Sequence, residues 1–238
     1  VNKNSLKNIN HPYGSGVVNN AGRLSIVEFL DFLSTKCSEN ISKNNFQFKN
    51  LQFKNKLFLY EGDRFKKVFM CQGVNATQNP MFNYLPIIPN KGELINVKSK
   101  DLPNFILNCG VFSLPINDYK FTIGSTYNHR DHLEKNTKEA KEELLEKIGK
   151  VINLNNVDFL SQKYGFRPTT SDRKPLIGEH PIIKNLYIIN GMGSKAVLMA
   201  PLLINELLKN KVNKSADIKR FQKKIKPLNI NYANSLIH

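Results

Sequence analysis

The chain of 238 residues contains no tryptophan, only three cysteines and no long apolar run. Cys37, Cys71 and Cys109 are far apart, and the sequence has neither a Cys-x-x-Cys pair nor a Cys/His spacing typical of zinc. This pattern argues against a disulfide framework and favours a reduced, cytoplasmic protein without a bound metal. No run is long enough to span a bilayer and no leader opens the chain, so we expect no membrane span. The first residue is Val1 rather than methionine, which we interpret as a fragment or a processed form.

Acidic residues are scarce relative to basic ones, with 19 Asp and Glu against 35 Lys and Arg, a formal net charge of +16. One interpretation is a nucleic-acid partner, since clustered lysine and arginine release the counterions of phosphate. The basic residues are scattered, however, except in the stretch 209–227, and no aromatic residues alternate with them in a stacking pattern. We therefore favour a solvated basic surface and keep a nucleic-acid partner as the alternative.

The hydrophobic fraction of 40% is sufficient for a packed core, and its periodicity predicts both helices and strands. A period near 3.6 predicts helices at 25–37, at 134–152 and, after a glycine turn, up to residue 208, and the basic C-terminal stretch is expected to add a peripheral helix. Short apolar or alternating runs predict strands, which we place at 46–53, 56–60, 66–71, 84–89, 92–98, 110–116, 119–127, 158–168 and 185–190. This order predicts an α/β fold of the mixed α+β kind, with an antiparallel sheet in the middle of the chain.

The strand expected at 185–190 runs into a glycine turn, Gly191-Met192-Gly193-Ser194-Lys195-Ala196, and then an apolar helix. This order matches the outline G-x-G-x-x-G/A of a dinucleotide site, in which glycines allow close approach and a helix N-terminus attracts negative charge. That motif also needs a further strand that ends in an acidic residue, and the basic stretch after residue 208 does not supply one. The turn is therefore expected to face another electron-rich ligand edge, or no ligand, rather than a pyrophosphate.

Two stretches taken together, GFRPTTSDRKPLIG at 165–178 and NGMGSKAVLMAP at 190–201, resemble the C-terminal signature of FAD-dependent oxidoreductases of the D-amino-acid oxidase family. That family includes glycine and sarcosine oxidases and the oxidoreductase half of a bifunctional enzyme that modifies wobble uridine in tRNA. Upstream stretches resemble the family in the same order, so the resemblance covers most of residues 11–208. It implies an incomplete FAD-binding Rossmann-like domain, formed by 1–83 and 171–238, interleaved with an antiparallel-sheet substrate domain at 84–170.

The resemblance also implies roles for particular residues. The family's arginine in G-x-R-P binds the substrate carboxylate in several members, and it corresponds to Arg167, which Phe166 and Pro168 would hold in place. Tyr127 would line the same pocket. The implied FAD-binding residues lie at a strand end and in the glycine turn, where backbone N–H groups would stabilise negative charge on the reduced flavin; they are Gly73, Gly191, Met192, Gly193, Ser194, Lys195 and Ala196. No residue is assigned as a catalytic base, because orientation and electrostatics carry hydride transfer to a flavin.

The family's N-terminal strand, G-x-G-x-x-G turn and helix have no counterpart in this sequence, since Gly14 to Gly16 lie outside any such pattern. We therefore expect a truncated family member that binds FAD poorly by itself and that leaves apolar surface exposed.

The leading interpretation of function is FAD-dependent oxidation of a carboxylate-bearing amine or amino acid, by hydride transfer to the flavin. One alternative is the oxidation of a carboxymethylaminomethyl group on the wobble uridine of tRNA, with Arg167 binding that carboxylate. The other alternative is a basic binding module with a degenerate flavin fold and no catalysis, whose full-length form would be colourless. The expected partner is thus a small-molecule amine or amino acid, with tRNA as the alternative, and the sequence indicates no oligomeric state.

Overall fold

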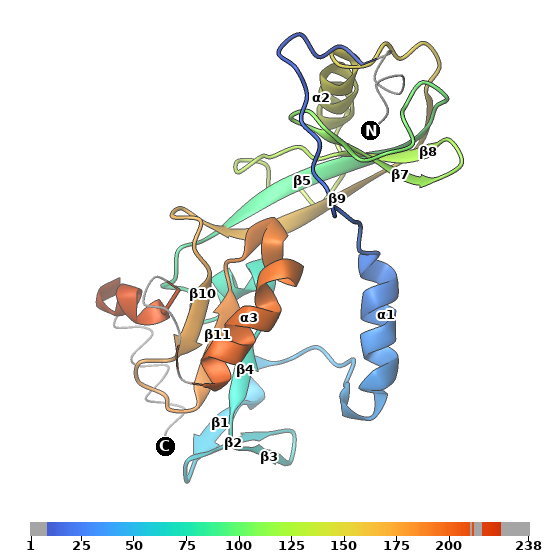
Figure 1. Cartoon of the computed structure of the whole chain (residues 1–238). Coiled ribbons are helices and arrows are strands. Elements are labelled where there is room, and N and C mark those ends of the chain that lie inside the picture. Colours follow the sequence, from blue (N-terminus) through green and yellow to red (C-terminus); the bar gives the residue numbers. More distant parts are fainter. Residues whose placement is uncertain (1–8, 210, 212–215, 225–238) are drawn as a thin grey trace.

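The computed structural model describes residues 9–209, 211 and 216–224 (Figure 1). Its α-helices are α1 (Ile26–Lys36), α2 (Lys138–Gly149) and α3 (Ala196–Leu208), and its strands form three separate sheets in the described part of the chain. The mixed α/β class predicted from the sequence is confirmed.

The largest sheet is antiparallel and has the strand order β6-β7-β8-β5-β9. Its strands are β5 (Ile87–Lys98), β6 (Leu107–Asn108), β7 (Phe112–Asn117), β8 (Lys120–Gly124) and β9 (Asp158–Thr170). β5 and β9 pair along their full lengths and form the long ribbon in the middle of Figure 1. α2 covers one face of this sheet, where Ile95, Ile123, Leu144 and Ile148 belong to one buried cluster. Because neighbouring residues of a strand point to opposite faces, Asn90 and Gly92 of β5 lie on the face away from α2.

A second sheet has the order β10-β11-β4 and lies in the lower part of Figure 1. β10 (Leu176–Glu179) pairs antiparallel with β11 (Leu186–Asn190), and β11 pairs parallel with β4 (Val68–Met70). The parallel pairing brings the C-terminal ends of β4 and β11 to the same edge of the sheet. α3 begins near that edge and packs through Leu203 and Leu207 against Ile177 of β10.

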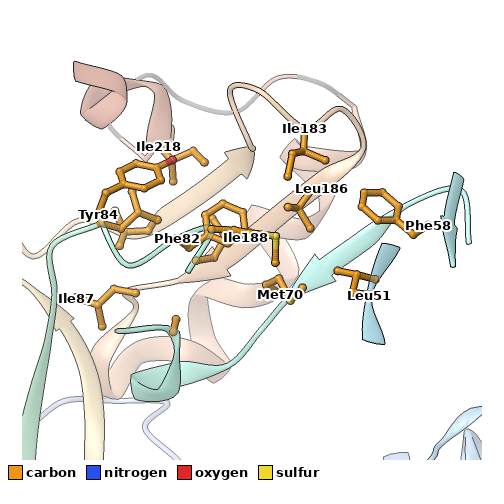
Figure 2. Close-up of a cluster of buried hydrophobic side chains, with 14 residues drawn as sticks. Leu51, Phe58, Met70, Phe82, Tyr84, Ile87, Ile183, Leu186, Ile188 and Ile218 are labelled. Carbon is orange, nitrogen blue, oxygen red and sulfur yellow. The ribbon is translucent and has the colours of Figure 1, made fainter. Parts of the chain in front are cut away.

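The lower core combines segments that are far apart in sequence. Figure 2 shows Leu51, Phe58, Met70, Phe82 and Leu186 among the side chains gathered there. The small antiparallel sheet of β1 (Gln52–Lys54), β2 (Leu57–Tyr60) and β3 (Asp63–Phe65) closes this core. Its first hairpin turns through two consecutive residues with positive φ, at 55 and 56, as a tight type I′ connection requires.

The structure corrects several of the predicted elements. The two strands expected at 84–89 and 92–98 form one continuous strand, β5. The strand expected at 46–53 is reduced to β1, because the 3₁₀ helix η3 (Phe48–Asn50) precedes it. β3, β6 and β10 were not predicted. In the basic C-terminal stretch the described part forms the 3₁₀ helix η6 (Ile218–Lys224), and the rest of the expected helix lies outside the described residues.

The helix predicted at 25–37 is confirmed as α1, but none of its residues is buried. Figure 1 shows α1 standing apart from the sheets. Most of its large apolar side chains are exposed, among them Val27, Leu30 and Phe32, and so are Leu198 and Leu202 on the outer side of α3. The expected exposure of apolar surface is therefore present in the structure.

Candidate functional site

A cavity of about 800 Å³ lies where the end of the large sheet meets the start of α3. Arg167 of β9 and Tyr127, which follows β8, contribute to one side of it. The glycine turn at 191–195 contributes to the other side. The carboxylate anchor and the flavin-facing turn that were predicted from separate stretches of sequence therefore face one shared space.

Arg167 lies on the face of the sheet that α2 does not cover. Its guanidinium donates hydrogen bonds to Ser125 Oγ (2.6 Å) and to the Thr126 carbonyl (3.3 Å). The guanidinium carbon lies 4.5 Å from the ring centroid of Tyr127, a cation–π contact. These three contacts come from one short segment after β8, and they hold the side chain in one orientation before any ligand binds.

Gly92 explains how the guanidinium can lie so close to the sheet. A Cβ at this position would overlap the guanidinium of Arg167. Gly92 pairs across the ladder with Gly165, and Asn90 pairs with Arg167, so the arginine side chain crosses the sheet diagonally to reach the space above Gly92. Gly92 therefore provides the space that the Arg167 guanidinium occupies, and it is not a turn residue.

The Arg167 guanidinium has no carboxylate partner among the described residues. It is half-buried, and burial lowers its pKa, while Tyr127 opposes that effect. Its hydrogen bonds to Ser125 and Thr126 use only part of its five N–H donors. A partly desolvated cation with free donors in a cavity is chemically suited to an anion, above all to a planar carboxylate that accepts two parallel hydrogen bonds.

The glycine turn follows β11 directly and leads into α3. Gly191 and Gly193 adopt φ values of 73° and 55°, and a Cβ at Gly191 would press against Thr170 and Leu176. Only glycine combines that conformation with that closeness. The short 3₁₀ helix η5 (Gly193–Lys195) then passes into α3, whose N-terminus is not capped by a side chain. The first N–H groups of such a helix, together with its dipole, attract negative charge.

Asn190 links the two strand ends below this turn. Its Nδ2 donates to the Gly73 carbonyl (2.8 Å), and its Oδ1 accepts from the N–H of Gly191 (2.8 Å). Gly73 follows β4 with a φ of 56°, and the position its Cβ would take is open space. The adjacent ends of the parallel strands β4 and β11 are thus held together by one buried amide.

A buried charged network fixes the segment that carries Tyr127. Lys91, 1% exposed, donates to Asp131 Oδ2 (2.7 Å) and to the Lys135 carbonyl (2.6 Å), with Glu93 Oε1 at 3.4 Å. Burial alone would lower the pKa of Lys91, but Asp131 and Glu93 raise it above its usual value. Glu93 in turn accepts hydrogen bonds from the backbone and side chain of Thr137 and from Gln162. The segment from residue 125 to 137 is therefore attached to the α2 face of β5 while Tyr127 reaches the opposite side.

Most of the predicted site residues line the cavity, but two of them do not. Arg167, Tyr127, Gly191, Met192, Gly193, Ser194 and Lys195 line the cavity, whereas Gly73 and Ala196 are not among its lining residues. Tyr119 lies in the β7–β8 turn beside Lys100 and is not among the lining residues. Further lining residues were not predicted from the sequence, among them Asn90, His129, Thr169 and Arg173. Asn90 does not stand out locally, because β5 is polar at several neighbouring positions.

Within the described ranges, no group of three histidine, cysteine or acidic side chains gathers to hold a metal ion. No helix of the described chain has the length and apolar character needed to cross a membrane.

Comparisons with known proteins found a matching family model and several relatives. The family model described as FAD dependent oxidoreductase (DAO) matches residues 47–207. Glycine oxidase from Pseudomonas aeruginosa is 28% identical over 140 residues, which cover 57% of this chain and 38% of that protein. A bifunctional protein of tRNA 5-methylaminomethyl-2-thiouridine biosynthesis from Marinobacter nauticus is 28% identical over 137 residues, 52% of this chain and 22% of that protein.

Solved structures share the fold. Glycine oxidase from Geobacillus kaustophilus superimposes with a TM-score of 0.59 at 20% identity, covering 72% of this chain and 50% of that one. L-proline dehydrogenase from P. horikoshii gives a TM-score of 0.60 at 20% identity, covering 74% and 54%. The chain therefore spans about half the length of these structures, and well under half the length of the curated relatives above.

Proposed function

This chain belongs to the DAO family of FAD-dependent oxidoreductases, and we propose that it carries the substrate-binding side of an enzyme that oxidises a carboxylate-bearing amine or amino acid. In this proposal residues 84–170 form the substrate domain, and 1–83 and 171–238 belong to the FAD-binding part. Glycine oxidases among its relatives act on a substrate of this class by name.

The observation that carries the proposal is the state of Arg167. Its half-buried guanidinium pairs with no carboxylate among the residues that the structure describes. Contacts with Ser125, Thr126 and Tyr127 hold it so that its remaining N–H donors are available to the cavity. A substrate carboxylate would supply the missing negative charge and accept a bidentate pair of hydrogen bonds. Because the arginine is held in advance, little conformational entropy is lost when the substrate binds.

The residues opposite Arg167 are suited to the electron-rich edge of a flavin. The turn from Gly191 to Lys195 allows a flat ring to approach the backbone, and the N-terminus of α3 stabilises negative charge there. The Lys195 side chain is exposed at the same turn and adds a cation. FAD, when bound, supplies the acceptor for the hydride that leaves the substrate.

The chain's own contribution to catalysis is positioning. No aspartate or glutamate is among the residues that line the cavity. The described lining of the cavity therefore offers no carboxylate base. Arg167 would hold the substrate carboxylate, and the glycine turn at 191–195 would hold the flavin ring opposite it. The reacting C–H bond would then point at the flavin, and this orientation accelerates hydride transfer without a dedicated base.

The test is an Arg167→Met change in the flavin-loaded protein. The expected result is a loss of about 10²-fold in kcat/KM for an amino-acid substrate, because one charge-assisted bidentate contact is removed, with the visible flavin absorption retained. A matched control is Arg64→Met, which removes an exposed arginine in β3 outside the cavity lining and should leave kcat/KM unchanged. Equal kinetics for the Arg167 variant and the wild type would refute the proposal, and a full-length protein that never binds flavin would favour a non-catalytic binding module.

A second substrate is a carboxymethylaminomethyl uridine in tRNA, which presents the same amine and carboxylate. The named tRNA-modifying relatives, the net charge of +16 and the exposed cations Arg173 and Lys195 beside the cavity support this candidate. It predicts tRNA binding that weakens steeply as salt rises, because each phosphate contact releases counterions. Absence of tRNA binding at low salt would eliminate it and leave the small-molecule substrate.

A further inference from the structure

Asn90 occupies a second polar position in the same cavity. It lies on β5 directly opposite Arg167 of β9, is 4% exposed, and is among the residues that line the cavity. Its Nδ2 is 3.2 Å from Nε2 of His129, so the amide nitrogen has a partner in the neighbouring loop. Its Oδ1 is buried and has no hydrogen-bond partner in the described part of the chain.

An unpaired buried carbonyl is unusual, because the free energy lost when the oxygen leaves water is not recovered by a hydrogen bond in the protein. Of the buried side-chain atoms that lack a partner among the described residues, Asn90 Oδ1 is the one that belongs to the cavity lining. The neighbouring Ile88 carbonyl already accepts from Thr169, and the Thr126 carbonyl from Arg167. The cavity thus presents one acceptor without a donor next to one cation without an anion.

The spacing of these two groups suits an α-amino acid. The guanidinium of Arg167 lies over Gly92, two residues along β5 from Asn90 on the same face, which corresponds to roughly 7 Å along the strand. An α-amino acid has its nitrogen and its carboxylate on one shared carbon, and two hydrogen bonds of about 2.9 Å each make up the remaining distance. A simple carboxylate would satisfy Arg167 and leave Asn90 Oδ1 unpaired.

We propose that Asn90 Oδ1 accepts a hydrogen bond from the substrate's amino group, so that Asn90 and Arg167 together select α-amino acids over carboxylates that lack nitrogen. The inference rests on the proposed function, in which Arg167 binds the substrate carboxylate. His129 holds the amide so that Oδ1 faces the ligand. Asn90 is a specificity residue, and it transfers no proton.

The test compares glycine with acetate, which carry the same carboxylate with and without the amine. Binding of each is titrated by NMR of the isotope-labelled 238-residue chain, whose spectrum also reports folding of each variant. Wild type should bind glycine about tenfold or more tightly than acetate, since a hydrogen bond between a charged and a neutral group is worth at least that ratio. Asn90→Leu should bind acetate as wild type does and should lose the preference for glycine. Asn90→Gln retains a neutral amide with its acceptor oxygen and should keep more of the preference than Asn90→Leu does.

The outcomes separate the two proposals. Acetate binding that disappears in Arg167→Met, with no preference for glycine in wild type, overturns the role of Asn90 and leaves the carboxylate anchor intact. Parallel losses of acetate and glycine in both Asn90 variants would show that the amide donates to the carboxylate, which also overturns the inference. Failure of wild type to bind either ligand would overturn both proposals.

Discussion

Gly92 is the position at which an added side chain would most directly displace Arg167, the proposed substrate anchor. Its missing Cβ leaves the space that the Arg167 guanidinium fills. The overlapping atoms belong to the end of a flexible side chain, so an alanine here can be accommodated when the arginine moves. The fold would survive, and the orientation of the guanidinium toward the cavity would be lost.

We therefore predict that Gly92→Ala weakens binding of a carboxylate such as acetate by about 10- to 100-fold, the value of one charge-assisted pair, while the free energy of unfolding changes little. Titration calorimetry or NMR measures the first quantity and urea denaturation the second. The control is Gly165→Ala, at the position paired with Gly92, where an added Cβ meets no atom within 4 Å. Loss of binding in the control as well would show that the substitutions disturb the sheet, rather than the space that the Arg167 guanidinium occupies.

His180 is a buried titratable group outside the cavity lining. Its Nδ1 accepts from the N–H groups of Ile182 and Ile183, so Nε2 carries the hydrogen and donates to the Met81 carbonyl at 3.2 Å. Burial is the main cause that lowers its pKa from 6.5 to about 4. The native state therefore holds His180 neutral at pH values where the unfolded chain takes up a proton.

This difference predicts a loss of stability with acid. The loss is absent above pH 6.5, grows as the pH decreases, and reaches its full value of about 3 kcal/mol by about pH 4. Urea denaturation at pH 7.5 and pH 4.5 should show the decrease in wild type and a smaller one in His180→Gln, which begins less stable. His11→Gln, at an exposed site, should keep the wild-type dependence. An unchanged slope in His180→Gln would assign the acid sensitivity to other groups.

At the scale of elements, the connection between β8 and α2 is held by charge. Glu93 accepts three hydrogen bonds from Thr137 and Gln162 and lies beside Lys91, all with little exposure at the carboxylate. Removing the charge of Glu93 would leave the positive charge of Lys91 less balanced by nearby carboxylates. The amide hydrogens of a glutamine at this position would also face the donor groups of Thr137 and Gln162. The connection would loosen together with the Ser125, Thr126 and Tyr127 contacts to Arg167.

We predict that Glu93→Gln lowers the free energy of unfolding by about 3 kcal/mol, as expected when one partner of a buried ionic network is changed. Urea denaturation measures this loss, and weaker acetate binding should accompany it. Glu142→Gln is the matched control, because the Glu142–Lys138 pair on α2 is exposed and should contribute little. Equal effects of the two substitutions would argue that the network does not stabilise the connection.

The local elements were largely predictable from their periodicity, as α2 and β9 show. The sequence Pro89-Asn90-Lys91-Gly92 was interpreted as a break between two strands, yet β5 continues through it. Pro89 faces Pro168 where β8 does not reach β5, so the missing donors disturb the ladder little. The Arg167 guanidinium occupies the space that a Cβ at Gly92 would fill. The two residues are far apart in sequence, so no local pattern reveals this contact.

The candidate site was predictable only where the residues form a motif. Arg167 and the glycine turn were identified because each stands in a recognisable stretch, and the structure brings them to one cavity. Ser125, Asn190 and Asn90 act through long-range hydrogen bonds or through an unpaired atom. Such roles depend on strand register, which a single sequence does not specify.

At the scale of the whole molecule, apolar surface is distributed unevenly. α3 buries Leu203 and Leu207 against β10, while Leu198 and Leu202 on its outer side are 81% and 61% exposed. α1 adds Val27, Leu30 and Phe32 on a helix with no buried residue, and other exposed apolar side chains lie elsewhere on the described surface. Exposed apolar side chains grouped on helices in this way favour association with other apolar surfaces.

The described chain, studied alone, should therefore bind the dye ANS and self-associate as its concentration rises. Replacing both Leu198 and Leu202 by Gln should reduce dye fluorescence and shift sedimentation toward the monomer, with little change in the free energy of unfolding, because neither side chain is packed. Leu203→Ala, one residue away on the same helix but 6% exposed, should instead destabilise the fold by about 2–5 kcal/mol and increase dye binding. If the double variant unfolded as readily as Leu203→Ala, the outer side of α3 would have to be packed in solution, and the exposed surface inferred from the structure would be wrong.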